Sequence, residues 1–217
     1  MAIGLILLIS RIVATCYGGP FSGPPSAPPH EPDEAHLFGR CVSVQGGAVI
    51  LSLHPTTDGR YEVVLDQTLF HPQGGGQPYD QGEISSDQEK FFVEEVRFRD
   101  NVVVHIGRFS AGPFSVGQSA QMAVDETRRA LNRRNHSAGH LIDSALTSLG
   151  VSLVPTKGFH FPEGPYVEYQ GIFAENEREA MRENLEVEAN RLVQRNLPVT
   201  FRTEQIEGKN VRIVTIS

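Results

Sequence analysis

The sequence has no tryptophan and only two cysteines, Cys16 and Cys41, among its 217 residues. Two cysteines in different kinds of sequence argue against a disulfide framework, and we expect a reducing compartment. The sequence has fewer basic than acidic residues, with 19 Lys and Arg against 26 Asp and Glu, so its formal net charge is −7. This balance excludes the strongly basic field of proteins that capture nucleic acid by bulk charge, although it allows a local basic patch.

The sequence also lacks a long hydrophobic run. Residues 1–9, MAIGLILLI, are apolar but far too short to span a bilayer, and no basic residue precedes them. A targeting segment, a mis-set start codon and a disordered extension all stay open for this stretch. Residues 17–33 are rich in proline and glycine, which predicts an extended linker. We therefore expect a leader and linker over residues 1–34 and a cytoplasmic protein with no membrane partner, unless the leader directs it to an organelle or to secretion.

Short β-type runs dominate the next part of the chain. AVILSLH, YEVVLDQ, KFFVEEVRF and NVVVHIG are rich in Val, Ile, Phe and Tyr, and Gly, Asp, Pro or Asn separate them at close spacing. This pattern predicts an antiparallel β-barrel over residues 35–124. QGG at 45–47 and TTDGR at 56–60 are the predicted hairpin turns.

The hydrophobic period then changes from that of strands to that of helices. Residues 125–149 contain no proline, Asp125 is a suitable N-cap, and Gly150 is a suitable stop. A second helix is expected over residues 175–196, with strands between the two helices and at the C-terminal end. The predicted fold class is α+β, with the N-terminal barrel followed by an α+β domain over residues 125–217.

His136 and His140 are the centre of the functional hypothesis. An HxxxH pair on a helix places both imidazoles on one face, one turn apart, within reach of one metal ion such as zinc. Asp143 follows on the same face, where it could bind the metal or orient a histidine. The alternative interpretation is a solvated helix face with two histidines and an exposed carboxylate.

A second pattern is the glycine-rich segment FHPQGGGQP at 70–78. Gly74, Gly75 and Gly76 cannot stabilise a strand, because they add chain entropy and no side chain to pack. Such a loop suits a place where the backbone comes close to a ligand, with Gln77 directly after it. The alternative is a flexible turn between strands.

Three segments together resemble a known family. FHPQGGGQPYDQGEI, NHSAGHLIDSAL and KGFHFPEGPYVEYQG are similar to the editing domain of alanyl-tRNA synthetase, and most closely to the free-standing alanyl-tRNA editing proteins. The resemblance implies a β-barrel followed by an editing domain that hydrolyses tRNA for alanine mischarged with serine or glycine. It implies that His136 and His140 bind zinc.

The resemblance also assigns further site residues. The loop from Gly74 to Gln77 is expected to line the substrate pocket together with Asp143 and His160. Gln77 and Ser137 are the expected catalytic groups, since Ser137 keeps a hydroxyl where the family often has a threonine.

One motif of the family is missing. The family completes its zinc site with a downstream Cys-Gly-Gly-x-His motif, and this chain ends at Ser217 before it. We expect a truncated form, a degenerate copy that binds tRNA without catalysis, or a substitution of the missing ligands by Asp143 or His160. A synthetase with ligase activity is not expected, because the chain has no class II aminoacylation motif and is too short for that domain.

Arginines cluster just before the HxxxH pair. Arg129 and Arg133 are one helical turn apart and share a face, so they could hold phosphates at the acceptor end of the tRNA for alanine. Lys157 is a further candidate for this contact. The alternative is a solvated helix face that Glu126 partly neutralises.

Overall fold

The structure is a computed structural model that describes residues 5–8, 44–171, 173–206 and 209–216. It divides into two compact units. One unit spans residues 41–133, and the other contains residues 134–217 together with a short N-terminal strand. Cys16, Cys41 and the linker expected over residues 17–33 lie outside the described residues.

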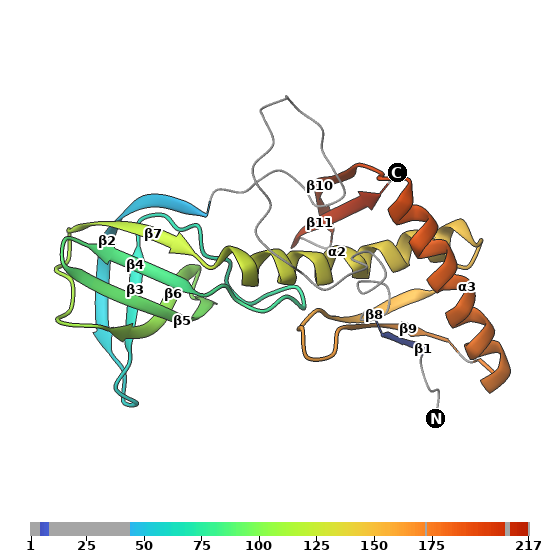
Figure 1. Ribbon diagram of the computed structural model, residues 1–217, viewed down its shortest axis with the longest axis horizontal. Coiled ribbons are helices and arrows are strands. Elements are labelled where there is room, and N and C mark those ends of the chain that lie inside the picture. Colours follow the sequence, from blue (N-terminus) through green and yellow to red (C-terminus); the bar gives the residue numbers. More distant parts are fainter. Residues whose placement is uncertain (1–4, 9–43, 172, 207–208, 217) are drawn as a thin grey trace, which may run out of the picture. The chain divides into compact units, whose positions relative to one another are not determined.

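Six antiparallel strands close into a barrel in the first unit (Figure 1). Their order around the barrel is β2-β3-β6-β5-β4-β7. The bounds are β2 Gln45–Pro55, β3 Tyr61–Leu65, β4 Gly82–Ser86, β5 Glu89–Arg99, β6 Val102–Phe109 and β7 Ser119–Val124. The predicted barrel and the α+β class are therefore confirmed.

Alternation of apolar and polar residues explains why these segments close around a core. In β7 every second residue is buried, which is the pattern of a strand with one face toward the interior. Ile50, Val63, Ile84, Phe91 and Val96 are fully buried and belong to one hydrophobic cluster. Burial of this apolar surface is the main stabilising contribution to the barrel.

One of the two predicted turns is wrong. Residues 45–47 lie inside β2 and pair with β7 from Gln45↔Ala123 to Gly47↔Gln121. A Cβ on Gly46 would lie 3.1 Å from Cδ1 of Leu69, so the glycine here allows close packing and does not mark a turn. The other turn is present, because the Thr56 amide donates to the Arg60 carbonyl at 2.8 Å.

The barrel core also contains a histidine. His105 is fully buried, its Nδ1 lies 3.0 Å from the Val63 carbonyl oxygen, and its Nε2 lies 2.8 Å from Oγ1 of Thr68. Burial lowers the pKa of His105 from 6.5 to about 4, against the opposing effect of the Val63 carbonyl. The imidazole is therefore neutral at pH 7, where Nδ1–H donates to Val63 and Nε2 accepts from Thr68.

The second unit contains two small sheets. Strands β1 (Leu5–Leu8), β9 (Tyr166–Gln170) and β8 (Val154–Phe159) form an antiparallel sheet in that order. Strand β1 pairs along β9 from Leu5↔Tyr169 to Leu8↔Tyr166, so part of the apolar N-terminal run is a strand. Strands β10 (Val199–Ile206) and β11 (Lys209–Ile216) form a separate hairpin.

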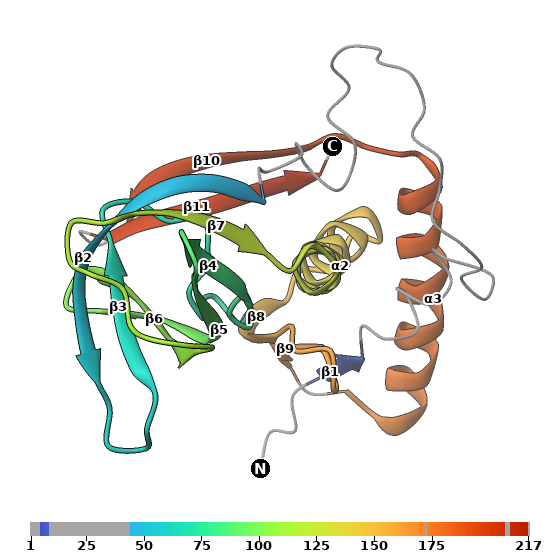
Figure 2. The same cartoon turned by 60° about the vertical axis from the view of Figure 1, so that its left-hand side comes forward.

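Two helices accompany these sheets, α2 (Glu126–Ser148) and α3 (Glu175–Gln194), which Figure 2 shows from a second angle. Helix α2 is capped at its N-terminal end, where Oδ1 of Asp125 accepts from the Arg128 amide at 3.0 Å. Gly150 has a φ of 70° and ends the helix. No helix in the described part of the chain is long and apolar enough to span a membrane.

The core of the second unit is formed by α2, α3 and β9. Buried residues from these elements belong to one cluster, including Leu141, Ala145, Tyr169, Leu185 and Ala189. This packing fixes which face of α2 points inward, and it therefore fixes the position of the polar residues next to that face.

Candidate functional site

Helix α2 carries both histidines of the HxxxH pair. The ring centroids of His136 and His140 are 5.0 Å apart, and the ring planes differ by 24°. His136 is half-buried and the His140 side chain is 33% exposed, so neither residue is shut off from solvent. The pair lies next to Ala138 and Gly139, which are buried.

A third imidazole joins this pair from the segment after β8. The ring of His160 lies 4.6 Å from that of His136 with an interplanar angle of 12°, so the order is His140, His136, His160. His160 is only 5% exposed, and its Nδ1 is buried without a hydrogen-bond partner. Burial, and then the charge of His140, lower the pKa of His160 from 6.5 to about 4, while Asp143 acts in the opposite direction.

Two glycines make room for this ring. A Cβ on Gly139 would lie 2.5 Å from Cε1 of His160, and a Cβ on Gly158 would lie 2.8 Å from its Nε2. Both distances are too short for any other residue unless the imidazole moves. The ring is therefore held in a slot between α2 and β8.

The chemistry of zinc fits this cluster only in part. Zinc binds neutral imidazole nitrogens, and His136 and His140 lie one helical turn apart as two ligands of such a site should. However, the described residues contain no group of three or more His, Cys, Asp or Glu side chains arranged to hold a metal ion. The described chain therefore supplies two donors of a zinc site and does not show a third one in place.

Asp143 lies beside His140 and also lines a hollow along α2. Its Oδ1 accepts a hydrogen bond from the Tyr169 hydroxyl, and its Oδ2 lies 3.7 Å from Nδ1 of His140. Asp143 and Tyr169 both line a hollow of about 310 Å³ next to the C-terminal half of α2. Asp143 is thus a polar group shared by the cluster and the hollow.

Ser137 and Lys157, the two other predicted site residues of this unit, lie on different elements. Ser137 is half-buried on α2 directly after His136. Lys157 is exposed on β8, and its ammonium lies 5.6 Å from the centroid of the Tyr166 ring. Its contact with a phosphate stays a prediction.

The glycine-rich loop belongs to the barrel unit and is ordered by its own hydrogen bonds. Gly74 and Gln77 form a bridge, with N···O distances of 3.2 and 2.9 Å, and the φ angles of Gly75 and Gly76 are 56° and 76°. Glycine adopts such conformations at no steric cost, because it has no Cβ. The Gln77 residue is buried, while Gly74 and Gly75 are exposed.

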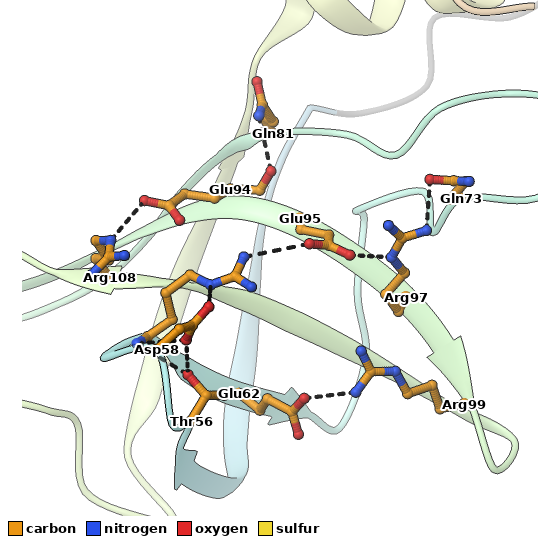
Figure 3. A network of polar contacts seen from close by, with 11 residues as sticks. Thr56, Asp58, Glu62, Gln73, Gln81, Glu94, Glu95, Arg97, Arg99 and Arg108 are labelled. Carbon is orange, nitrogen blue, oxygen red and sulfur yellow. Dashed lines mark hydrogen bonds and ion pairs between the residues drawn. The ribbon is translucent and has the colours of Figure 1, made fainter.

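A polar network on the barrel wall anchors the start of this loop (Figure 3). The Arg97 guanidinium donates to Oε1 of Gln73 at 2.7 Å and also to the Glu95 carboxylate. The Gln73 amide donates to the Val96 carbonyl at 3.1 Å. The start of the loop is therefore tied to strand β5 of the barrel.

Arg129 holds the far end of the loop and corrects one prediction. Its guanidinium donates to Oδ2 of Asp80 and to the Leu69 carbonyl, and the two charged side chains are 7% and 0% exposed. A buried, paired guanidinium cannot contact phosphates on the surface, so Arg129 has a structural position. Arg133, its predicted partner on the same helix face, is half-buried.

Comparison with known proteins adds one finding. Residues 49–128 match the family model described as tRNA synthetases class II (A). This segment is related to those synthetases. The match supports the alanyl-tRNA synthetase-related family and a function connected with tRNA. It covers most of the barrel, the glycine-rich loop and the first residues of α2, and it ends before His136.

Sequence reasoning missed two features of the second unit. Tyr169 was not singled out, although its hydroxyl holds Asp143 from a strand 26 residues further along the chain. Gly158 was not recognised as the wall of the His160 slot. The residues next to Tyr169 and Gly158 in the sequence do not indicate these contacts, because the partners lie elsewhere in the chain or depend on the fold.

Proposed function

We propose that this protein hydrolyses the ester of mischarged tRNA for alanine, removing serine or glycine, and that it acts in trans as an editing factor. The observation that carries the proposal is the row of imidazoles His140, His136 and His160 next to a hollow with a carboxylate at its rim. The family match supports tRNA as the partner. The acceptor end of the tRNA for alanine is the proposed binding element.

The chemistry needed for this reaction is modest, because an aminoacyl ester is already activated. Catalysis requires a positioned water and stabilisation of the tetrahedral oxyanion. His160, whose pKa is about 4, is too weak a base to remove a proton from water near pH 7. We assign to its buried imidazole the role of a neutral group that orders the cluster, and to His136 and His140 the binding of a zinc ion beside the reacting water.

The proposal includes a zinc ion with His136 and His140 as two of its ligands. The ion would act as a Lewis acid on the ester carbonyl. Ser137, directly after His136, is proposed to hydrogen-bond the hydroxyl of a serine substrate. A site that binds this hydroxyl rejects alanine strongly, because its polar groups are left unpaired with the correct amino acid. The exposed Gly74 and Gly75 of the barrel unit are proposed to contact the tRNA.

The test is a deacylation assay with purified chain and tRNA for alanine charged with labelled serine. Release of serine should be catalytic, and it should fall at least a hundredfold in His136→Ala and in His140→Ala, since a group acting in the transition state is lost. His54→Ala is the matched control, because His54 is an exposed barrel histidine and its removal should leave the rate unchanged.

The same samples distinguish the proposal from a non-catalytic tRNA-binding protein. Binding of the uncharged tRNA without any release of serine would overturn the hydrolase and favour the binding protein. ATP–pyrophosphate exchange with alanine would instead indicate ligase activity and contradict both.

A further inference from the structure

The hollow in the second unit lies between the C-terminal half of α2, the segment that follows it and strand β9. Its lining includes Asp143, Leu146, Thr147, Leu153 and Tyr169. At about 310 Å³ it is at the small end of ligand sites, so it can take an amino-acid-sized group but not a whole nucleoside with its ester. The hollow is open to solvent, and Leu146 and Leu153 make part of its wall apolar.

Asp143 places a carboxylate in the wall of this hollow. Its side chain is 46% exposed, and Tyr169 donates to Oδ1 from inside the core. Neither Lys nor Arg is among the described residues that line the hollow. The distance from Oδ2 of Asp143 to Nδ1 of His140 is 3.7 Å, which is too long for a hydrogen bond. Oδ2 can therefore accept a hydrogen bond from a ligand.

Tyr169 fixes the orientation of the Asp143 carboxylate. The tyrosine is 1% exposed and belongs to the core of the second unit. Burial, followed by the hydrogen bond to Asp143, raises the pKa of Tyr169 far above its usual value, so the hydroxyl keeps its proton. A permanent donor on Oδ1 leaves Oδ2 as the oxygen that meets a ligand.

We propose that this hollow binds a small primary ammonium group through the Asp143 carboxylate, with Tyr169 as the residue that positions it. The inference rests on the proposed function, in which the ligand is the α-ammonium of the amino acid esterified to tRNA. An α-amino group titrates near pH 8 and is largely protonated at pH 7. The position of Asp143 beside His140 places the ammonium next to the imidazoles, where the ester carbonyl must lie for hydrolysis.

The experiment titrates the full isotope-labelled chain with L-serinamide and follows amide chemical shifts by NMR. The matched ligand is N-acetyl-L-serinamide, which has the same side chain and no positive charge. L-serinamide should shift the residues that line the hollow and should bind about tenfold more tightly than the acetylated compound, the expected effect of a hydrogen bond to a charged group. Equal affinities, or no saturable shift at these residues, would overturn the inference.

Variants assign the effect to the carboxylate. Asp143→Asn should lose about tenfold in affinity for L-serinamide, and Tyr169→Phe should lose less, because the carboxylate stays but its orientation is freed. Asp87→Asn is the control, since Asp87 is an exposed carboxylate on the barrel unit and its loss should change nothing. Unchanged affinity in Asp143→Asn would contradict the inference, and the two-ligand comparison on the unmodified chain decides the matter even if a variant does not fold.

The deacylation assay separates this inference from the proposed function. If the unmodified chain releases serine and Asp143→Asn has the same KM for charged tRNA, the ammonium site is wrong and the hydrolase stands. If L-serinamide binds as described and no serine is released from tRNA, the site stands and the hydrolase is wrong.

Discussion

Replacement of Gly139 by alanine should destabilise the protein, although alanine is the better helix former. In a helix interior Gly→Ala usually stabilises by about 0.5–1 kcal/mol. Here the new Cβ would lie 2.5 Å from Cε1 and 3.2 Å from Nδ1 of His160. Overpacking of a filled core typically costs about 1–3 kcal/mol, so the net effect should be a loss of about 1 kcal/mol in the free energy of unfolding.

The decisive version is a double-mutant cycle with His160→Ala, which removes the ring. In that background Gly139→Ala should stabilise by about 0.5–1 kcal/mol, because only the helix preference is left. The sign of the Gly139→Ala effect should therefore reverse, with a coupling free energy of about 2 kcal/mol. The His160 ring also lies close to Gly158, where an added Cβ would be 2.8 Å from its Nε2, so little room is left for the ring to shift.

The assay is urea unfolding of the four proteins, followed by far-UV circular dichroism at 222 nm, where α2 and α3 contribute. Gly158→Ala gives an independent check, and its cost should also be relieved by His160→Ala. The reasoning is refuted if Gly139→Ala stabilises the protein in both backgrounds by the same amount, because the slot for His160 would then not exist.

Three further predictions concern charges and the metal. The free energy of unfolding should decline as the pH falls from about 6.5 to about 4. In this range His105 is protonated in the unfolded chain and stays neutral in the folded protein. A difference of about 2.5 pKa units corresponds to about 3 kcal/mol for His105, to be measured as urea midpoints against pH. His160 has a similarly lowered pKa, so His105→Gln should remove only the share of His105, and the double variant with His160→Gln should remove most of the decline. Arg129→Met should cost about 3–5 kcal/mol by leaving Asp80 charged and buried, and the double variant with Asp80→Leu should recover most of this loss in the same unfolding assay. Zinc analysis after dialysis should find bound metal that is lost in His136→Ala and kept in His54→Ala, and equal zinc in both variants would contradict the assigned ligands.

Local signals in the sequence were enough for the main elements. Alternation of apolar residues predicted the barrel strands, because one face of each strand must turn inward. Asp125 and Gly150 were the expected helix ends, and they flank α2, since capping depends on residues within one turn. These signals operate over a few residues, so they can be recognised without knowledge of the fold.

Contacts across long stretches of sequence could not be predicted in this way. Arg129 was placed among the surface arginines because its neighbours are basic, yet Asp80, 49 residues earlier, holds it in the interior. The glycines at 46 and 47 suggested a turn, yet they lie in β2, where Leu69 approaches Gly46 closely. In both cases the deciding partner lies elsewhere in the chain, and only the folded structure identifies it.

The same limit applies to the candidate site. The HxxxH spacing predicted that His136 and His140 share a helix face, and the family resemblance added Asp143 and His160 to the expected pocket. The structure shows the His160 ring stacked on His136 and adds Tyr169 of β9 as the partner of Asp143. The sequence pattern thus indicated the chemistry of the cluster, whereas its third ring and its hollow depend on how β8 and β9 pack on α2.

The most direct measurement of the central claim is the rate of ester hydrolysis on matched substrates, tRNA for alanine charged with serine and the same tRNA charged with alanine. The account predicts that the purified chain releases serine well above the uncatalysed rate and much faster than alanine. Release of neither amino acid above the rate without protein would contradict it.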